Sequence, residues 1–218
     1  MQNTINYSKS IAVKGNYDVL VAGSGPAGIC AAVAAAREGA KVALIERYGV
    51  VGGNLTTGYV GPILGMVGKG TMRDELVKLL GVPQNDMIGE TGRAHDFEMA
   101  KILLAEFVDH PNIDVYLQTT VTDVIKEGQT LRGVIVTAGE GPFALMGKIV
   151  IDATGDGLVS FLAGAPTEKG RDDGLMQPVT LEFTIAGVDE SKGVICIGDV
   201  DNVCLGEERF LDYCKRLA

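Results

Sequence analysis

The stretch that decides the fold is "YDVLVAGSGPAGICAAVAAAREGAKVALIER", residues 17–47. It opens with a short apolar run that is rich in Val and ends at a glycine, as a buried parallel strand does. Pro26 stands where a helix would take its first residue, since a proline there gives up only an N–H that has no helical partner. Small apolar residues carry this helix to Arg37, and "KVALIE" (41–46) forms the next strand. The order strand, tight turn, helix, strand predicts one βαβ unit.

The tight turn reads "GSGPAG" and holds glycines at positions 23, 25 and 28. In a dinucleotide-binding turn the first glycine allows the sharp turn, the second lets the backbone approach a pyrophosphate, and the third lets helix and strand pack closely. The N–H groups at the helix start would face that phosphate. Glu46 ends the next strand, where an acid accepts hydrogen bonds from ribose hydroxyls and repels a 2′-phosphate. We predict a dinucleotide site, and the turn alone does not separate NAD from FAD.

Two further glycine turns extend this pattern. The segment "ERYGVVGGNLTTG" (46–58) continues from the acid into the pair Gly52 and Gly53. This pair would give the backbone a second close approach to an extended dinucleotide; the alternative is a flexible loop without a ligand. The segment "GKIVIDATGDG" (147–157) is a buried strand that ends in a glycine turn, either at the ligand-binding carboxyl edge of the sheet or as an ordinary strand-to-helix turn.

Together, "DVLVAGSGPAG", "ALIERYGVVGGNLTTG" and "DATGDG" resemble the FAD-dependent oxidoreductases of the glutathione-reductase type. Within these flavoproteins they are most similar to the branch that resembles the flavoprotein component of heterodisulfide reductase, over about residues 11–187. The resemblance implies non-covalent FAD, bound in an extended form. The residues implied at the cofactor are Gly23, Ser24, Gly25, Pro26, Ala27 and Gly28 at the pyrophosphate, Glu46 and Arg47 at the adenosine ribose, Gly52, Gly53, Asn54 and Thr56 between phosphate and flavin, Val121 at the adenine, and Thr154, Gly155 and Asp156 near the glycine turn.

The predicted fold class is α/β, a Rossmann-like FAD-binding domain with a parallel sheet and an inserted β-hairpin formed by residues 120–127 and 131–138. We expect this domain to span residues 1–170. Residues 171–218 would be the incomplete start of an antiparallel substrate domain, because the alternating segment 178–187 begins a new sheet. Flavoproteins of this type are about twice as long, so we expect a truncated chain or one piece of a split protein.

The predicted function is hydride transfer between a small substrate and FAD. An NAD-binding dehydrogenase domain, or a catalytically incomplete chain that needs a partner chain, are the alternatives. The sequence assigns no catalytic residue. The two histidines, His95 and His110, flank a predicted helix, and structural roles at the ends of that helix are the simpler interpretation for both. The possible partners, besides the substrate, are a complementing chain, a second copy of the chain and an iron–sulfur electron-transfer protein.

Charge, cysteine spacing and hydrophobicity argue against several other classes of protein. The net charge of −9 and the lack of a basic stripe argue against nucleic-acid binding. The four cysteines include no C-x-x-C pair, so we expect no metal site. The N-terminus shows no signal peptide, and no apolar stretch is long enough to span a membrane, so a cytoplasmic protein is expected.

Overall fold

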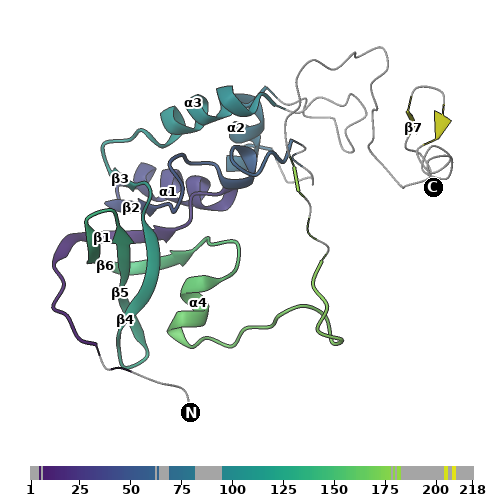
Figure 1. The fold of residues 1–218 in the computed structure, drawn as a ribbon. Helices are drawn as coiled ribbons and strands as arrows, with labels where there is room; N and C mark the ends of the chain where they lie inside the picture. The colour runs from purple at the N-terminus through teal and green to yellow at the C-terminus, as the bar shows by residue number, and fades with distance from the viewer. Residues whose placement is uncertain are drawn as a thin grey trace. The chain divides into compact units, whose positions relative to one another are not determined.

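A computed structural model describes residues 5, 7–61, 63, 69–81, 95–177, 179, 181–182, 204–205 and 208–209. Its elements are, in chain order, β1 (Val13–Ala22), α1 (Pro26–Arg37), β2 (Val42–Ile45), the 3-10 turn η1 (Gly53–Leu55), α2 (Met72–Leu79), α3 (Phe97–Val108), β3 (Ile113–Tyr116), β4 (Thr120–Glu127), β5 (Thr130–Ala138), β6 (Gly141–Asp152), α4 (Leu158–Ala163), β7 (Cys204–Leu205) and β8 (Glu208–Arg209). Figure 1 shows their arrangement.

The chain forms two compact units. The first comprises residues 1–57 and 98–177 and contains the sheet with its glycine turns, and the second comprises residues 58–97 and 178–218. Of the segment expected to begin a substrate domain, residues 178–187, the structure describes only three, so that expectation stays a prediction. The boundary expected at residue 170 also stays a prediction.

Six strands of the first unit form one sheet in the order β3-β2-β1-β6-β5-β4. The four strands β3, β2, β1 and β6 are parallel, and β6, β5 and β4 pair antiparallel. In the register of the parallel part, Ala22 stands beside Ile45 on one side and Asp152 on the other. The ends of β1, β2 and β6 therefore meet at one edge, as a Rossmann-like α/β fold requires. The predicted fold class is confirmed.

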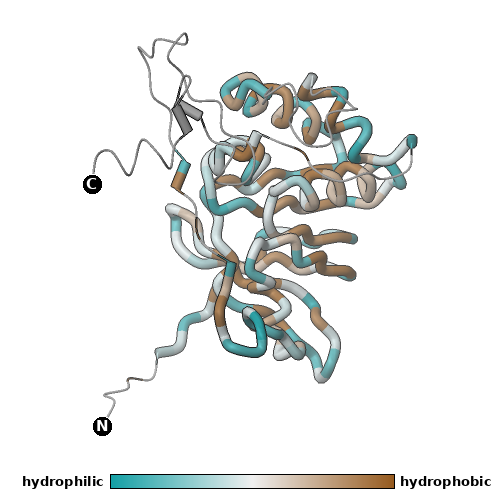
Figure 2. The backbone as a smooth tube through the Cα atoms, turned by 90° about the vertical axis from the view of Figure 1, so that its right-hand side faces the viewer, coloured by the Kyte–Doolittle hydropathy of each residue, from teal (hydrophilic) through white to brown (hydrophobic). Residues whose placement is uncertain are grey.

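The two faces of this sheet bury different partners (Figure 1). Helix α1 packs on the parallel strands with Ile29, Ala32 and Val33, none of which is more than 2% exposed. On the opposite face, side chains of the parallel strands form one core with those of β4 and β5 in the same sheet and with α4, and the fully buried residues there include Leu20, Val134, Val136 and Leu145. Figure 2 shows the resulting hydrophobic stretches along the strands of the sheet. Burial of each large apolar side chain contributes about 1.5–3 kcal/mol, and this hydrophobic effect is the main force that holds the layers together.

Helix α1 begins and ends as its sequence predicts. Pro26 is its first residue, and the first backbone bond runs from the Ile29 N–H to the Gly25 carbonyl, 3.0 Å away. At the other end, the N–H groups of Glu38 and Gly39 bond the carbonyls of the last turn, and Gly39 takes a φ of +86° that suits glycine. The length of α1 is thus set by a proline and a glycine.

Strand β6 is longer than the predicted strand, and the helix after it is additional. The strand begins at Gly141 rather than at 147, because its first half pairs with both β5 and β1. It ends at Asp152, and α4 follows at Leu158. The expected hairpin is therefore part of a three-stranded antiparallel meander that continues into the parallel sheet.

Candidate functional site

Three turns of the first unit meet at the carboxyl edge of the sheet. The turn after β1 is joined to the turn after β6 by a bond from the Ala153 N–H to the Ala22 carbonyl, 2.9 Å. It is joined to the 46–58 loop by a bond from the Gly52 N–H to the Ser24 carbonyl, 2.8 Å. The structure thus brings together the three glycine-containing segments that the sequence singled out.

Two of the three glycines of "GSGPAG" are required by packing. Gly23 has a φ of +91°, and a Cβ there would lie 2.6 Å from the carbonyl oxygen of Ala153. A Cβ on Gly28 would lie 1.9 Å from the Gly23 oxygen and 3.3 Å from the Ala153 Cβ. Any side chain at either position would collide with backbone, which has no rotamer to change.

The third glycine of the turn, Gly25, has a different role. A Cβ there would meet nothing within 4 Å, and its φ of −63° is one that any residue adopts. Packing therefore does not require a glycine at this position. A ligand that approaches the backbone closely would give a reason for one.

The N-terminus of α1 beside Gly25 is suited to an anion. Its cap residue makes no side-chain hydrogen bond, and its first turn carries no acidic residue. The free N–H groups and the positive end of the helix dipole are therefore not neutralised by the chain. With the space at Gly25, this arrangement fits the pyrophosphate of a dinucleotide, and FAD is such a group.

Glu46 is held at the end of β2 by both its backbone and its carboxylate. The side chain is 5% exposed. Its Oε2 accepts hydrogen bonds from the Ser24 N–H at 3.0 Å and the Ser24 hydroxyl at 2.5 Å, and its Oε1 accepts one from the Tyr48 N–H at 2.7 Å. The backbone N–H and the hydroxyl of Ser24 are therefore both directed at Glu46, which the sequence did not predict.

The residues after Glu46 connect it to the start of β4. The Thr119 N–H donates to the Glu46 carbonyl and the Gln118 N–H to the Tyr48 carbonyl, at 2.8 and 2.9 Å. Val121, expected at the adenine, follows two residues later and is 6% exposed. Arg47 lies with its guanidinium carbon 4.8 Å from the centre of the Tyr48 ring. The placement of these residues beside Glu46 agrees with an adenosine site there, while their contacts with a cofactor stay predictions.

The loop with the second glycine pair packs directly on the first turn. Gly53 has a φ of +52°, and a Cβ there would lie 3.0 Å from the Cα of Gly25. Thr56 is fully buried, and its hydroxyl donates to the Val51 carbonyl at 2.8 Å, so it stabilises the loop from inside. Asn54 is exposed at the loop surface. Of the residues expected between phosphate and flavin, Asn54 is thus the one whose side chain is open to solvent.

The turn after β6 is built around Asp152. Its Oδ1 accepts from the Thr154 hydroxyl at 2.6 Å and the Thr154 N–H at 3.2 Å, and its Oδ2 accepts from the Ser160 N–H at 2.8 Å. The Thr154 oxygen also accepts from the Leu158 N–H at 2.8 Å. Burial alone would raise the pKa of Asp152, but the hydrogen bonds from Thr154 and Ser160 outweigh it and hold the pKa below its usual value.

The sequence predicted Thr154, Gly155 and Asp156 at this turn and did not predict the role of Asp152. The usable signal was an aspartate two residues before a threonine and just ahead of a short apolar helix, since Asp side chains commonly bond nearby backbone N–H groups. Gly155 and Asp156 are exposed, and a Cβ on Gly155 would meet nothing within 4 Å. The carboxylate thus shapes a turn whose tip is open.

The two histidines have the structural surroundings that the sequence favoured. In the second unit, His95 is buried, with Nδ1 3.2 Å from the Gly61 carbonyl oxygen and its ring edge-on to Phe97. In the first unit, His110 Nδ1 accepts from the Asn112 N–H at 3.1 Å in the turn before β3. Neither contact identifies a catalytic role.

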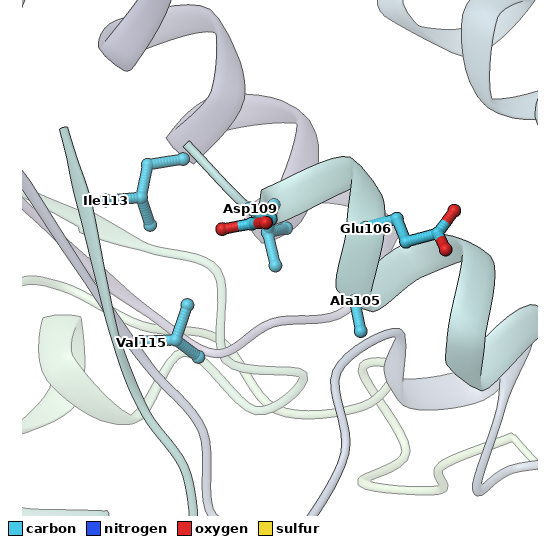
Figure 3. Close-up of a pocket in the computed structure, with 6 residues that line it drawn as sticks. Ala105, Glu106, Asp109, Ile113 and Val115 are labelled. Atoms are coloured by element: carbon cyan, nitrogen blue, oxygen red, sulfur yellow. The ribbon is translucent and has the colours of Figure 1, made fainter. Parts of the chain in front are cut away.

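A hollow of about 340 Å³ lies elsewhere in the first unit, between the end of α3 and the start of β3 (Figure 3). It is lined by Ala105, Glu106, Val108, Asp109, Ile113 and Val115. β3 is the edge strand of the sheet, so this hollow lies at that edge, whereas the glycine turns follow β1, β2 and β6. None of the predicted cofactor residues lines it, and we do not assign the cofactor to it.

Comparison with known proteins agrees with this geometry. Residues 18–218 match the family model described as FAD dependent oxidoreductase. The chain belongs to this family. The predicted cofactor, FAD, and the predicted class of flavoprotein oxidoreductases are thereby confirmed.

Among curated proteins, the chain is similar to soluble pyridine nucleotide transhydrogenases. The one from Pseudomonas syringae pv. syringae (strain B728a) is 36% identical over 183 residues, which are 84% of this chain and 36% of that protein. The one from Marinomonas sp. (strain MWYL1) is 30% identical over 153 residues, 64% of this chain and 31% of that protein. The chain thus spans about a third of the length of these relatives.

Among solved structures, Thermovibrio ammonificans THI4 is similar over 65% of this chain and 58% of its own chain, at 23% identity and with a TM-score of 0.48.

Within the described part of the chain, no helix is long and apolar enough to cross a membrane. The same residues contain no group of three or more His, Cys, Asp or Glu side chains that could hold a metal ion.

Proposed function

We propose that this chain is the FAD-binding part of an oxidoreductase that transfers a hydride between a small substrate and the flavin. The observation that carries the proposal is the open backbone at Gly25 beside the uncapped start of α1. The collisions at Gly23 and Gly28 explain those glycines by packing, whereas no packing contact explains the glycine at 25, and a ligand at that backbone would.

When bound, FAD supplies the hydride chemistry through its flavin ring. The chain's own contribution is to hold and orient the cofactor. The helix dipole and the N–H groups of Ala27 and Gly28, which lie in the first turn of α1, would attract the pyrophosphate, and Glu46 would accept a hydrogen bond from the adenosine ribose. The negative charge of Glu46 disfavours a cofactor with a phosphate on that ribose.

The substrate proposed for a first test is a pyridine nucleotide, because the similar curated proteins are named soluble pyridine nucleotide transhydrogenases. NADH and NADPH would then be the hydride donors to screen. A cytoplasmic location is proposed from the sequence, and the name of these relatives says of them only that they are soluble. Three further partners are proposed from the sequence: a complementing chain, a second copy of this chain, and an iron–sulfur protein that would accept electrons.

The proposal is tested by purifying the chain, recording its visible absorbance and identifying the cofactor released by heating. We expect flavin absorbance and FAD in near one-to-one amount, either as purified or after addition of FAD. The matched variant is Gly25→Ala, which should fold normally because its methyl group has free space, yet should bind FAD at least about tenfold more weakly. A protein that is folded by circular dichroism and takes up no FAD would contradict the proposal.

A further inference from the structure

The carboxylate of Glu46 is largely occupied by the chain itself. A carboxylate has two oxygens, and each accepts about two hydrogen bonds. Oε2 already accepts two, from the N–H and the hydroxyl of Ser24, and Oε1 accepts one, from the Tyr48 N–H. One acceptor position remains, and it is on Oε1.

This occupancy is rigid rather than incidental. Ser24 is fully buried and Glu46 is 5% exposed, so neither side chain has room to change its partner freely. The Ser24 hydroxyl donates at 2.5 Å, a short hydrogen bond of the kind that a charged acceptor makes. To turn the hydroxyl away from Oε2 would leave a buried donor without its acceptor, which is costly.

We propose that Ser24 is a specificity-determining positioning residue, which fills Oε2 of Glu46 so that the carboxylate binds a single hydroxyl of the adenosine ribose. This inference rests on the proposed FAD site and adds to it. An acid with both oxygens free would bind the 2′- and 3′-hydroxyls together, one on each oxygen. Here the second ribose hydroxyl finds no vacant position on Glu46.

FAD binding should therefore depend unequally on the 2′- and 3′-hydroxyls of the adenosine ribose. Removal of the hydroxyl that bonds Oε1 should weaken FAD binding by about tenfold, the usual effect of losing a hydrogen bond to a charged group. Removal of the other should change it by less than about twofold, since that hydroxyl makes no bond to the carboxylate. In Ser24→Ala, Oε2 is released from one donor and can accept the second hydroxyl, so that both removals should then weaken binding.

The experiment measures dissociation constants by flavin fluorescence, for protein freed of cofactor and titrated with FAD, 2′-deoxyadenosine FAD and 3′-deoxyadenosine FAD. Wild type, Ser24→Ala and the control Thr130→Ala are compared, the last losing an exposed hydroxyl at the tip of the β4–β5 hairpin. Circular dichroism and thermal unfolding confirm that each variant is folded. A merely structural role of Ser24 would weaken all three ligands by the same factor and leave their ratios unchanged.

The outcomes separate the inference from the proposed function. Unequal losses in wild type and in Thr130→Ala that become similar losses in Ser24→Ala support the inference. Equal losses for the two deoxy analogues in wild type, or the wild-type ratio retained in Ser24→Ala, overturn the inference while leaving the FAD site intact. A wild-type protein that binds none of the three ligands overturns the proposed function and the inference with it.

Discussion

The turn after β1 and the turn after β6 stand side by side at the same sheet edge, yet they are held in shape by opposite means. The first turn, Gly23–Gly28, depends on the absence of side chains, because backbone atoms fill the places where two Cβ atoms would be. The second, Asp152–Gly157, depends on a side chain that accepts three hydrogen bonds. Substitutions in the first turn should therefore destabilise the protein by steric collision, to the same extent at any pH. The second turn should be destabilised by loss of its hydrogen bonds, either through substitution of Asp152 or through its protonation at low pH.

The largest effect is expected from Gly28→Ala. The added methyl group would lie 1.9 Å from the Gly23 oxygen, and relief requires α1 to move away from β1. Overpacking of this kind typically costs up to about 3 kcal/mol, and we expect that much loss in the free energy of unfolding. Urea denaturation followed by circular dichroism measures it.

Gly25→Ala is the matched control for this collision. It adds the same methyl group to the same turn, where a Cβ would have nothing within 4 Å. Its unfolding free energy should fall by no more than about 1 kcal/mol, the cost of replacing an N-cap glycine by alanine, and so by much less than in Gly28→Ala. If the two variants were destabilised equally, the packing account of the first turn would be wrong.

The next effect is expected from Asp152→Asn, which keeps the shape of the side chain but removes its charge. An amide cannot accept on both ends, so the bonds from Thr154 and Ser160 cannot all be kept. Because the site is partly exposed to water, we expect a loss of about 1–2 kcal/mol in unfolding free energy. Asp156→Asn, at the exposed tip of the same turn, should leave stability unchanged and thus serves as control.

The same contrast explains what could be predicted from sequence. The spacing of Gly23, Gly25 and Gly28, with Pro26 between them, is a local signal, because each residue is fixed by atoms a few positions away. The fold class, α1 and the position of Glu46 follow from it. The early start of β6 at Gly141 comes from its pairing with β5, and from Ala144 onward β6 also pairs with β1, more than a hundred residues earlier. Periodicity within one segment contains neither pairing.

The polar details of the site were harder to predict for a related reason. Ser24 was expected at a pyrophosphate because of its place in the motif, and its bond to Glu46 arises only when β1 and β2 lie side by side. The role of Asp152 is local and was open to prediction, but a short helix of six residues such as α4 has too few turns for a periodic pattern. The limits were therefore contacts between segments and elements too short to show a period.

The pH dependence of stability sharpens the comparison. The folded pKa of Asp152 is lowered, with its hydrogen bonds outweighing burial, so the stabilising contribution is complete above the unfolded pKa of about 3.9. It is lost as the pH falls through the folded value. The stability difference between wild type and Asp152→Asn should therefore be constant from about pH 5 to 8 and shrink below about pH 4. The difference between wild type and Gly28→Ala should not change over this range.

The smallest effect tests a polar contact that is far from both turns. Tyr17, in the middle of β1, is 6% exposed, and its hydroxyl forms hydrogen bonds with Asp114 Oδ2 at 2.8 Å and the Tyr116 hydroxyl at 2.7 Å. Tyr17→Phe removes these bonds but keeps the ring, and the exposed Asp114 can bond water instead. We expect a loss of about 1 kcal/mol in unfolding free energy and no change in FAD affinity.

An alkaline titration separates this contact from simple packing of the Tyr17 ring. Burial raises the pKa of Tyr17, and the hydrogen bonds with Tyr116 and Asp114 raise it further, so the folded protein keeps this proton at a pH where the unfolded chain releases it. Stability from this group is complete below the unfolded pKa of about 10 and falls as the pH rises above it. Wild type should then lose its advantage over Tyr17→Phe above about pH 10, as followed by urea denaturation. An advantage that persists there would show that the Tyr17 hydroxyl acts through shape alone, in contrast to the hydrogen-bonded carboxylate of Asp152.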